Sequence, residues 1–183
     1  DGNEIVMFDT LDDDHLMRIG ELIHKKSVDR KIFALGSSGF EYAMARYWRR
    51  QGIVSEPQKF GAVGGKDQII VMSGSAAANT AEQINYAIAQ GFVSIPLHTD
   101  RLVNNDVAEE ERKRATSIAL QALAEGKSII IPATIGPDDP VISKTREAID
   151  QLEIDPSETG TRIARQQGLI LRELLVQTGM ARI

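Results

Sequence analysis

IIVMSGSAAANTAEQI, residues 69–84, leads from four apolar residues through the small-residue turn Ser73-Gly74-Ser75 into a segment with helical character. A short apolar run bounded by turn residues is typical of a buried strand, and glycine and serine commonly separate a strand from a helix. The stretch therefore predicts a strand at 68–72 and a helix that continues to about Gln90, where Gly91 ends it.

The same succession of strand and helix is repeated along the chain. Four further apolar runs each precede a segment with helical spacing of its apolar residues, at 5–8, 32–35, 93–97 and 128–131. Such alternation is typical of a largely parallel sheet with helices on both faces, a three-layer α/β fold. Because right-handed crossovers bring the turns after parallel strands to one edge, we expect the turns 36–39 and 73–75 to share the carboxyl edge of the sheet.

The composition of the 183 residues restricts the class of protein. A formal net charge of -5 argues against a nucleic-acid-binding surface, since such surfaces depend on lysine and arginine to neutralise phosphates. The chain has no cysteine, which excludes disulfides and thiolate catalysis and is compatible with a reducing compartment such as the cytoplasm. No apolar run approaches the roughly 20 residues of a membrane span. The abrupt start and end of the chain lead us to expect a piece of a longer protein.

Histidines and charged clusters do not predict a metal site. The three histidines lie far apart and make no metal-ligand spacing with carboxylates: His15, His24 and His98. The run Asp12–Asp14 is more typical of a helix N-terminus, where carboxylates offset the helix dipole. The charged run 109–114 is expected on the solvent face of its helix. We therefore predict no metal ligand in this chain.

The turn 73–75 admits three chemical interpretations. Its glycine and the free N–H groups of the following helix suit an anion such as a phosphate, and serine hydroxyls can add donors. Alternatively, Ser75 or Asn79 is only a helix cap. A nucleophilic Ser75 with His98 as its base is the third interpretation, although Ala77 replaces the second glycine of a G-x-S-x-G motif. The stretch matches neither a P-loop nor G-x-G-x-x-G.

A second small-residue segment, Gly36-Ser37-Ser38-Gly39, has more glycine and serine than a turn needs and is a further candidate for ligand contact. It continues as Phe40-Glu41-Tyr42-Ala43. Earlier in the chain, Asp9-Thr10 is followed by Asp14-His15-Leu16, and later the turn 73–75 is followed by Thr80 and Gln83. In this order the three motifs resemble the four-carbon acid sugar kinase family. Residues that depart from the family pattern are Phe40 for Leu, Ala76 for Cys and Ala77 for Ser.

The resemblance implies a two-domain kinase that uses ATP and Mg²⁺ to phosphorylate a four-carbon acid sugar of the threonate, erythronate or oxo-tetronate type. Residues 1–183 would be most of its nucleotide-binding domain. The acid-sugar domain would precede residue 1, and a Gly-Gly-Asp-Thr-Ser-Gly motif would follow residue 183. The partners would be ATP or ADP and a small sugar acid, with room for a homodimer and with no nucleic acid or membrane.

The resemblance also ranks the candidate site residues. Ser75 becomes the first nucleotide contact, with Gly74 and Ser73 beside it, and Gly36, Ser37, Ser38 and Gly39 follow. No residue of this chain is assigned a catalytic role, since the base would lie in the other domain, and the fragment alone would be inactive. Two alternatives remain, a serine-dependent hydrolase that uses Ser75 and a non-catalytic module that binds a small anion or sugar acid.

Overall fold

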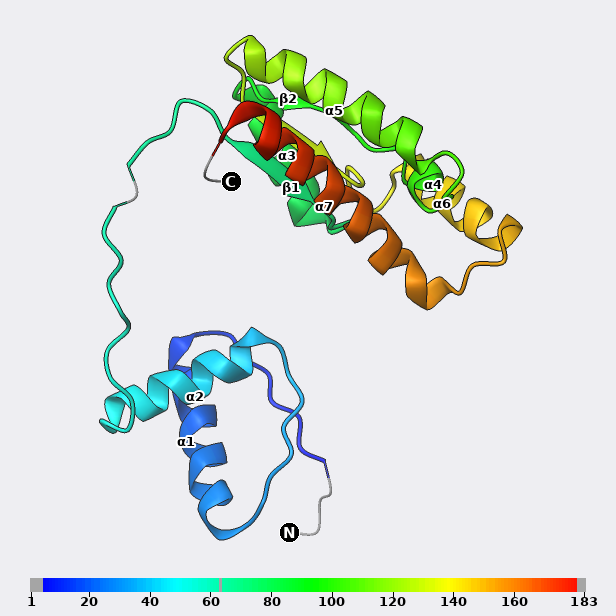
Figure 1. Ribbon diagram of the computed structural model, residues 1–183. Helices are drawn as coiled ribbons and strands as arrows, with labels where there is room; N and C mark the ends of the chain where they lie inside the picture. Colours follow the sequence, from blue (N-terminus) through cyan, green and yellow to red (C-terminus); the bar gives the residue numbers. More distant parts are fainter. Residues whose placement is uncertain (1–4, 63, 181–183) are drawn as a thin grey trace. The chain divides into compact units, whose positions relative to one another are not determined.

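The computed structural model describes residues 5–62 and 64–180 (Figure 1). Residues 1–4, 63 and 181–183, which include both chain ends, lie outside the described residues. The chain divides into two compact units, a first unit that spans Asp1–Val63 and a second unit that spans Gly64–Ile183. The sheet belongs to the second unit, and the described helices of the first unit form a pair.

In its described part, the second unit has three parallel strands, β1 (Ile70–Ser73), β2 (Val93–Ser94) and β3 (Ile129–Pro132). β3 lies in the middle of the order β1-β3-β2. Ile129 and Ile131 belong to the hydrophobic core cluster, and Ile130, which points to the opposite face, is buried as well. Both faces of β3 are therefore covered, and the predicted α/β fold with a parallel sheet is confirmed.

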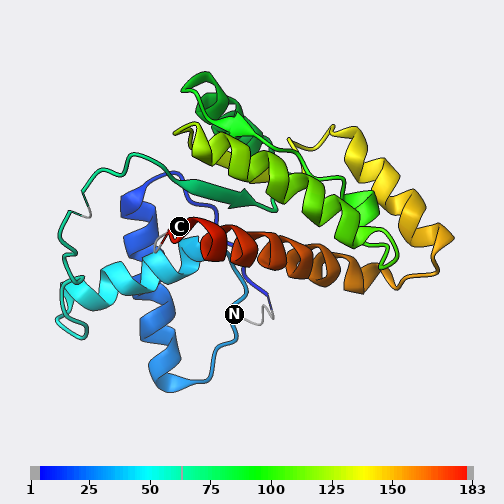
Figure 2. The same ribbon diagram turned by 45° about the horizontal axis from the view of Figure 1, so that its top comes forward.

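Helices cover this sheet in the second unit (Figure 2). They are α3 (Ala78–Ala89), α4 (Thr99–Leu102), α5 (Ala108–Ala124), α6 (Pro140–Gln151) and α7 (Thr159–Thr178), with a 3₁₀ turn, η1 (Pro156–Glu158), before α7. α5 and α7 lie side by side. Ala115, Ala119 and Ala122 of α5 recur with helical spacing and pack with Ile170 and Leu174 of α7 in the core cluster that includes β3.

The charged run 109–114 contains one buried carboxylate, Glu111, of which 1% is exposed. Its oxygens accept hydrogen bonds from the Arg114 guanidinium at 2.7 Å and from the His98 backbone N–H at 2.9 Å. The expectation that this run faces solvent is therefore wrong for Glu111. A buried charge is tolerated where a partner and hydrogen bonds replace water, and here they connect α5 to the segment after β2.

The first unit contains α1 (Asp13–Asp29) and α2 (Ser38–Arg50). Asp12 caps α1, because its Oδ1 accepts from the His15 N–H at 2.9 Å, and this confirms the predicted helix-capping role of the aspartate run. The two helix backbones touch at Gly20, where an added Cβ would lie 2.2 Å from the Ala43 carbonyl oxygen. The Trp48 indole N–H donates to His24 Nδ1 at 3.1 Å.

Two of the predicted strands, at 5–8 and 32–35, are wrong. Both segments lack strand structure in the described residues, and Met7 and Phe33 are each 90% exposed. A strand is stabilised only when its backbone groups pair with a neighbour, and the described part of the first unit supplies no paired strand. An apolar run is thus insufficient to form a strand when no neighbouring strand pairs with it.

None of the described helices is long and apolar enough to cross a membrane.

Candidate functional site

The turn Ser73-Gly74-Ser75 follows the carboxyl end of β1, as the sequence predicts. The Ser73 carbonyl oxygen accepts two hydrogen bonds, from the Ala133 N–H after β3 at 2.8 Å and from Gln167 Nε2 of α7 at 3.0 Å. Neighbouring elements therefore fix the start of the turn. Gly74 itself is exposed, and an added Cβ there would meet only Gln167 Oε1 at 3.7 Å, an ordinary contact distance.

Ser75 closes this turn with its side chain. Its Oγ accepts from the Ala77 N–H at 3.2 Å and from the Thr80 hydroxyl at 3.0 Å. A serine hydroxyl has two acceptor lone pairs and one hydrogen to donate. Because both lone pairs are occupied within the turn, the hydroxyl hydrogen of this exposed residue is the part that can bond to a ligand.

The helix that follows has no side-chain cap. The N-cap of α3 is Ala77, whose side chain cannot accept a hydrogen bond from the first turn, and Asn79 lies inside that turn. Ser75 lies two residues before the cap and bonds to Ala77 itself, so the simple capping interpretation is wrong for both Ser75 and Asn79. The N–H groups of Ala77 and Thr80 are already bonded, so those of Ala78 and Asn79, with the positive end of the helix dipole, are the ones available to an anion.

The loop after β3 lies against the start of α3, and sequence reasoning did not single it out. Gly136 has φ +109°, and a Cβ there would lie 3.0 Å from the Ala81 Cβ, so only glycine fits without strain. Asp139 organises the loop, accepting from the Ile135 N–H at 2.7 Å and the Val141 N–H at 2.9 Å. Burial raises the pKa of Asp139, but these hydrogen bonds outweigh it and bring the pKa below its usual value.

Gln167 was also missed, although it is buried and joins α7 to the turn. It stands 94 positions from Ser73 in the sequence, and nothing in its own neighbourhood indicates that contact. The loop after β3 had a usable signal, because the predicted strand at 128–131 already placed the following residues at the carboxyl edge of a parallel sheet.

The segment Gly36–Gly39 belongs to the first unit. Ser37 is the N-cap of α2, and its Oγ accepts from the Gly39 N–H at 3.3 Å. The turn follows no strand in the described residues, so the expectation that it lies at the carboxyl end of a strand is wrong. Ser37 has a local structural role, and ligand contact at Gly36, Ser37, Ser38 or Gly39 stays a prediction.

The described residues contain no group of three or more potential metal ligands. His98, expected as the base for a nucleophilic Ser75, is the N-cap residue of α4 and places its backbone N–H on Glu111. The recorded hydrogen-bond partners of the Ser75 hydroxyl are Ala77 and Thr80, and neither is a general base. This geometry suits a serine that binds a ligand better than a serine that attacks one.

Comparison with known proteins points to the part of the chain that contains the turn 73–75. The family described as nucleotide-binding C-terminal domain matches residues 70–183, which is more than half of the chain and includes Ser73–Ser75, α3 and Gln167. The chain belongs to this family. The resemblance to a C-terminal nucleotide-binding domain is therefore confirmed for residues 70–183, and the extension of that domain over residues 1–69 stays a prediction. The turn 73–75 lies at the beginning of the matched region, whereas Gly36–Gly39 lies outside it.

A 3-oxo-isoapionate kinase of Paraburkholderia graminis is 29% identical to this chain over 179 residues. The match covers 98% of the chain and 38% of that kinase, so the chain spans well under half the length of this relative. No solved structure matches the chain. The nucleotide-binding family thus describes the second unit, and the kinase matches the chain through both units.

Proposed function

We propose that this chain binds the phosphates of ATP or ADP at the turn 73–75 and the first turn of α3, as part of an ATP-dependent kinase for a small acid sugar. The observation that carries the proposal is the combination of an uncapped helix N-terminus with an exposed Ser75 whose hydroxyl hydrogen is free to donate. Both lie inside the region that matches the nucleotide-binding family. Anions bind readily at such helix ends.

The acceptor substrate is proposed from the resemblance and the relative. The relative is named as a kinase of 3-oxo-isoapionate, and the ordered motifs resemble kinases of four-carbon acid sugars. Both point to a small hydroxylated acid as the class of substrate. Its base and its specificity pocket are proposed to lie outside residues 1–183, and the chain alone is expected to bind nucleotide without transferring phosphate.

Mg²⁺ is the metal that such a reaction uses, and the described residues do not fit a preformed site for it. They hold no cluster of three ligating side chains, and the Asp139 oxygens are already engaged by Ile135 and Val141. Mg²⁺ usually takes few protein carboxylates and several substrate phosphate oxygens. We therefore assign no residue of this chain to the metal.

The direct test is calorimetric titration of the intact protein with ADP, comparing wild type with Ser75→Ala. Losing a hydrogen bond to a charged phosphate is expected to weaken binding about tenfold or more. Ser143→Ala is the matched control, because Ser143 is an exposed serine near the start of α6 whose Oγ bonds only locally, to the Pro140 carbonyl oxygen. Equal ADP affinity in wild type and Ser75→Ala would overturn the assignment of Ser75.

Phosphate transfer is tested separately, by incubating the intact protein with ATP, Mg²⁺ and a panel of four-carbon sugar acids. Formation of ADP that depends on one of the acids is the expected result. Binding of an acid without ADP formation under any condition would instead favour the non-catalytic binding module.

A further inference from the structure

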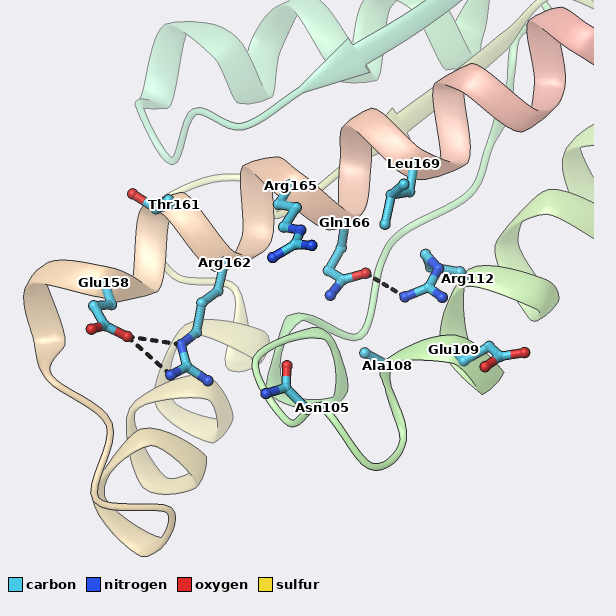
Figure 3. Close-up of a pocket in the computed structure, with 10 residues that line it drawn as sticks. All are labelled: Asn105, Ala108, Glu109, Arg112, Glu158, Thr161, Arg162, Arg165, Gln166 and Leu169. Atoms are coloured by element: carbon cyan, nitrogen blue, oxygen red, sulfur yellow. Dashed lines mark hydrogen bonds and ion pairs between the residues drawn. The ribbon is translucent and has the colours of Figure 1, made fainter.

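A second concave site lies on the other side of α7, between its first half and the start of α5 (Figure 3). The cleft has a volume of about 510 Å³, within the range of roughly 300–1,000 Å³ that is typical of small-molecule sites. Its lining is rich in arginine and contains two glutamates. The residues that line it are Asn105, Ala108, Glu109, Arg112, Glu158, Thr161, Arg162, Arg165, Gln166 and Leu169.

The two glutamates of the cleft are already neutralised. Glu158 pairs with Arg162 at 2.9 Å, and Glu109 pairs at 2.7 Å with Lys113, one turn further along α5. The hydrogen bond from Lys113 is the main reason that the pKa of Glu109 lies below its usual value. Arg112 and Arg165 make no ion pair with a carboxylate of the described residues. The cleft therefore retains two guanidinium groups without an ion-pair partner among the described residues, although Glu109 is near enough to Arg112 to feel its charge.

Gln166 adds a hydrogen-bond donor to the cleft. It is 8% exposed, and its Oε1 accepts from Arg112 Nη1 at 2.5 Å. Because a guanidinium can only donate, this bond fixes which end of the amide is oxygen and turns the amide nitrogen into the cleft, as Figure 3 shows. Among the described residues this nitrogen bonds to no acceptor, and it is not one of the fully buried atoms. It is therefore accessible from the cleft and free to donate to a ligand there.

The cleft and the turn 73–75 are separate sites. Gln167 points to the sheet and donates to the Ser73 carbonyl oxygen, whereas its neighbour Gln166 points to α5 and holds Arg112. Consecutive residues on a helix are about 100° apart around its axis. α7 therefore stands between the two sites, and a ligand in the cleft does not share the contacts proposed for the nucleotide.

We propose that this cleft binds a phosphoryl group, held by the guanidinium groups of Arg112 and Arg165 and by the Gln166 amide nitrogen. These three groups supply only donors, so they require a ligand rich in acceptors. Guanidinium groups bind tetrahedral oxyanions through paired hydrogen bonds. The volume beyond the phosphoryl group has an apolar wall from Ala108 and Leu169 and accommodates the organic part of a small phosphorylated metabolite.

The test uses the intact protein at constant ionic strength, with binding measured by calorimetry. Inorganic phosphate and glycerol 3-phosphate are the probes for wild type, Arg165→Gln and Arg172→Gln. Arg165 is exposed, so its replacement leaves the fold intact, and Arg172 is an exposed arginine of the same helix outside the cleft. Arg165→Gln is expected to weaken binding about tenfold, and Arg172→Gln is expected to bind as wild type does.

The outcomes separate the candidate ligands and the two sites. Tighter binding of glycerol 3-phosphate identifies an organic phosphate as the ligand, and equal binding of both probes identifies free phosphate. Failure of wild type to bind either probe overturns the proposal, as does an equal loss in both variants. ADP affinity is expected to be unchanged in Arg165→Gln. If it falls with the phosphate affinity, the cleft is part of the nucleotide site and the separate site is wrong, while the proposed nucleotide function stands.

Discussion

The turns 36–39 and 73–75 look alike in sequence and differ in structure. Each follows a short apolar run and precedes an amphipathic helix. In the first unit, Ser37 is the N-cap of α2, and the run before it is not a strand. In the second unit, Ser75 leaves the N-cap position to Ala77, and the run before it pairs with β3. The turn 36–39 thus supplies a side-chain cap to its helix α2, whereas the turn 73–75 leaves the N-terminus of α3 without a side-chain cap, and we call this end of α3 open.

This difference makes the turn 73–75 the stronger candidate for an anion site. A side-chain cap is worth about 1 kcal/mol, and α3 lacks one although two serines lie just before its N-terminus. The open end of α3 lies at the carboxyl end of a parallel strand, where α/β folds bind their ligands. The N-terminus of α2, where Ser37 already accepts from the Gly39 N–H, offers an anion fewer unbonded N–H groups.

The largest effect is expected at the loop that supports the open turn. Gly136→Ala places a Cβ 3.0 Å from Ala81 on a residue with φ +109°, which combines backbone strain with a tight contact. We expect a loss of about 2 kcal/mol in the free energy of unfolding, measured by urea denaturation of the intact protein. Gly160→Ala, where an added Cβ meets nothing within 4 Å, is the matched control. Equal stability of both variants would show that the loop relaxes freely.

A second glycine of the same edge is expected to behave in the opposite way. Gly74→Ala meets only Gln167 Oε1 at 3.7 Å, so the stability of the protein should be unchanged. If the phosphates approach the backbone here, the added methyl should weaken ADP binding about tenfold, the equivalent of one hydrogen bond to a charged group. Titration of the variant with ADP measures this. Wild-type affinity would remove close backbone approach as the reason for a glycine at this position.

The contrast between the turns also shows how much can be read from sequence. The runs at 68–72 and 128–131 were predicted as strands and pair with each other, because buried parallel strands are continuously apolar. The runs at 5–8 and 32–35 are apolar as well, but a strand forms only with a pairing partner, and the local sequence does not show whether one is present. Glu111 and Gln167 are buried through contacts with residues 13 or more positions away, which no local pattern contains.

Ser37→Ala tests the closed turn. Removing the side chain that accepts from the Gly39 N–H should lower the stability of the first unit by about 1 kcal/mol. Circular dichroism during denaturation measures this loss. A purely local cap predicts wild-type ADP affinity in this variant. Weaker ADP binding without loss of stability would instead assign the turn 36–39 to the nucleotide, as the family resemblance implies.

The smallest effect is expected from closing the open turn. Ala77 has the extended backbone of an N-cap, φ -70° and ψ 146°, so the hydroxyl of Ala77→Ser can accept from the first turn of α3. We expect a gain of about 0.5–1 kcal/mol in the free energy of unfolding, measured by urea denaturation. The serine would then occupy an N–H group that the proposed phosphate also uses, but its own hydroxyl could donate to the ligand instead. A stabilised variant with unchanged ADP affinity would show that cap and ligand share the helix end, and a stabilised variant with weaker binding would show that they compete for it.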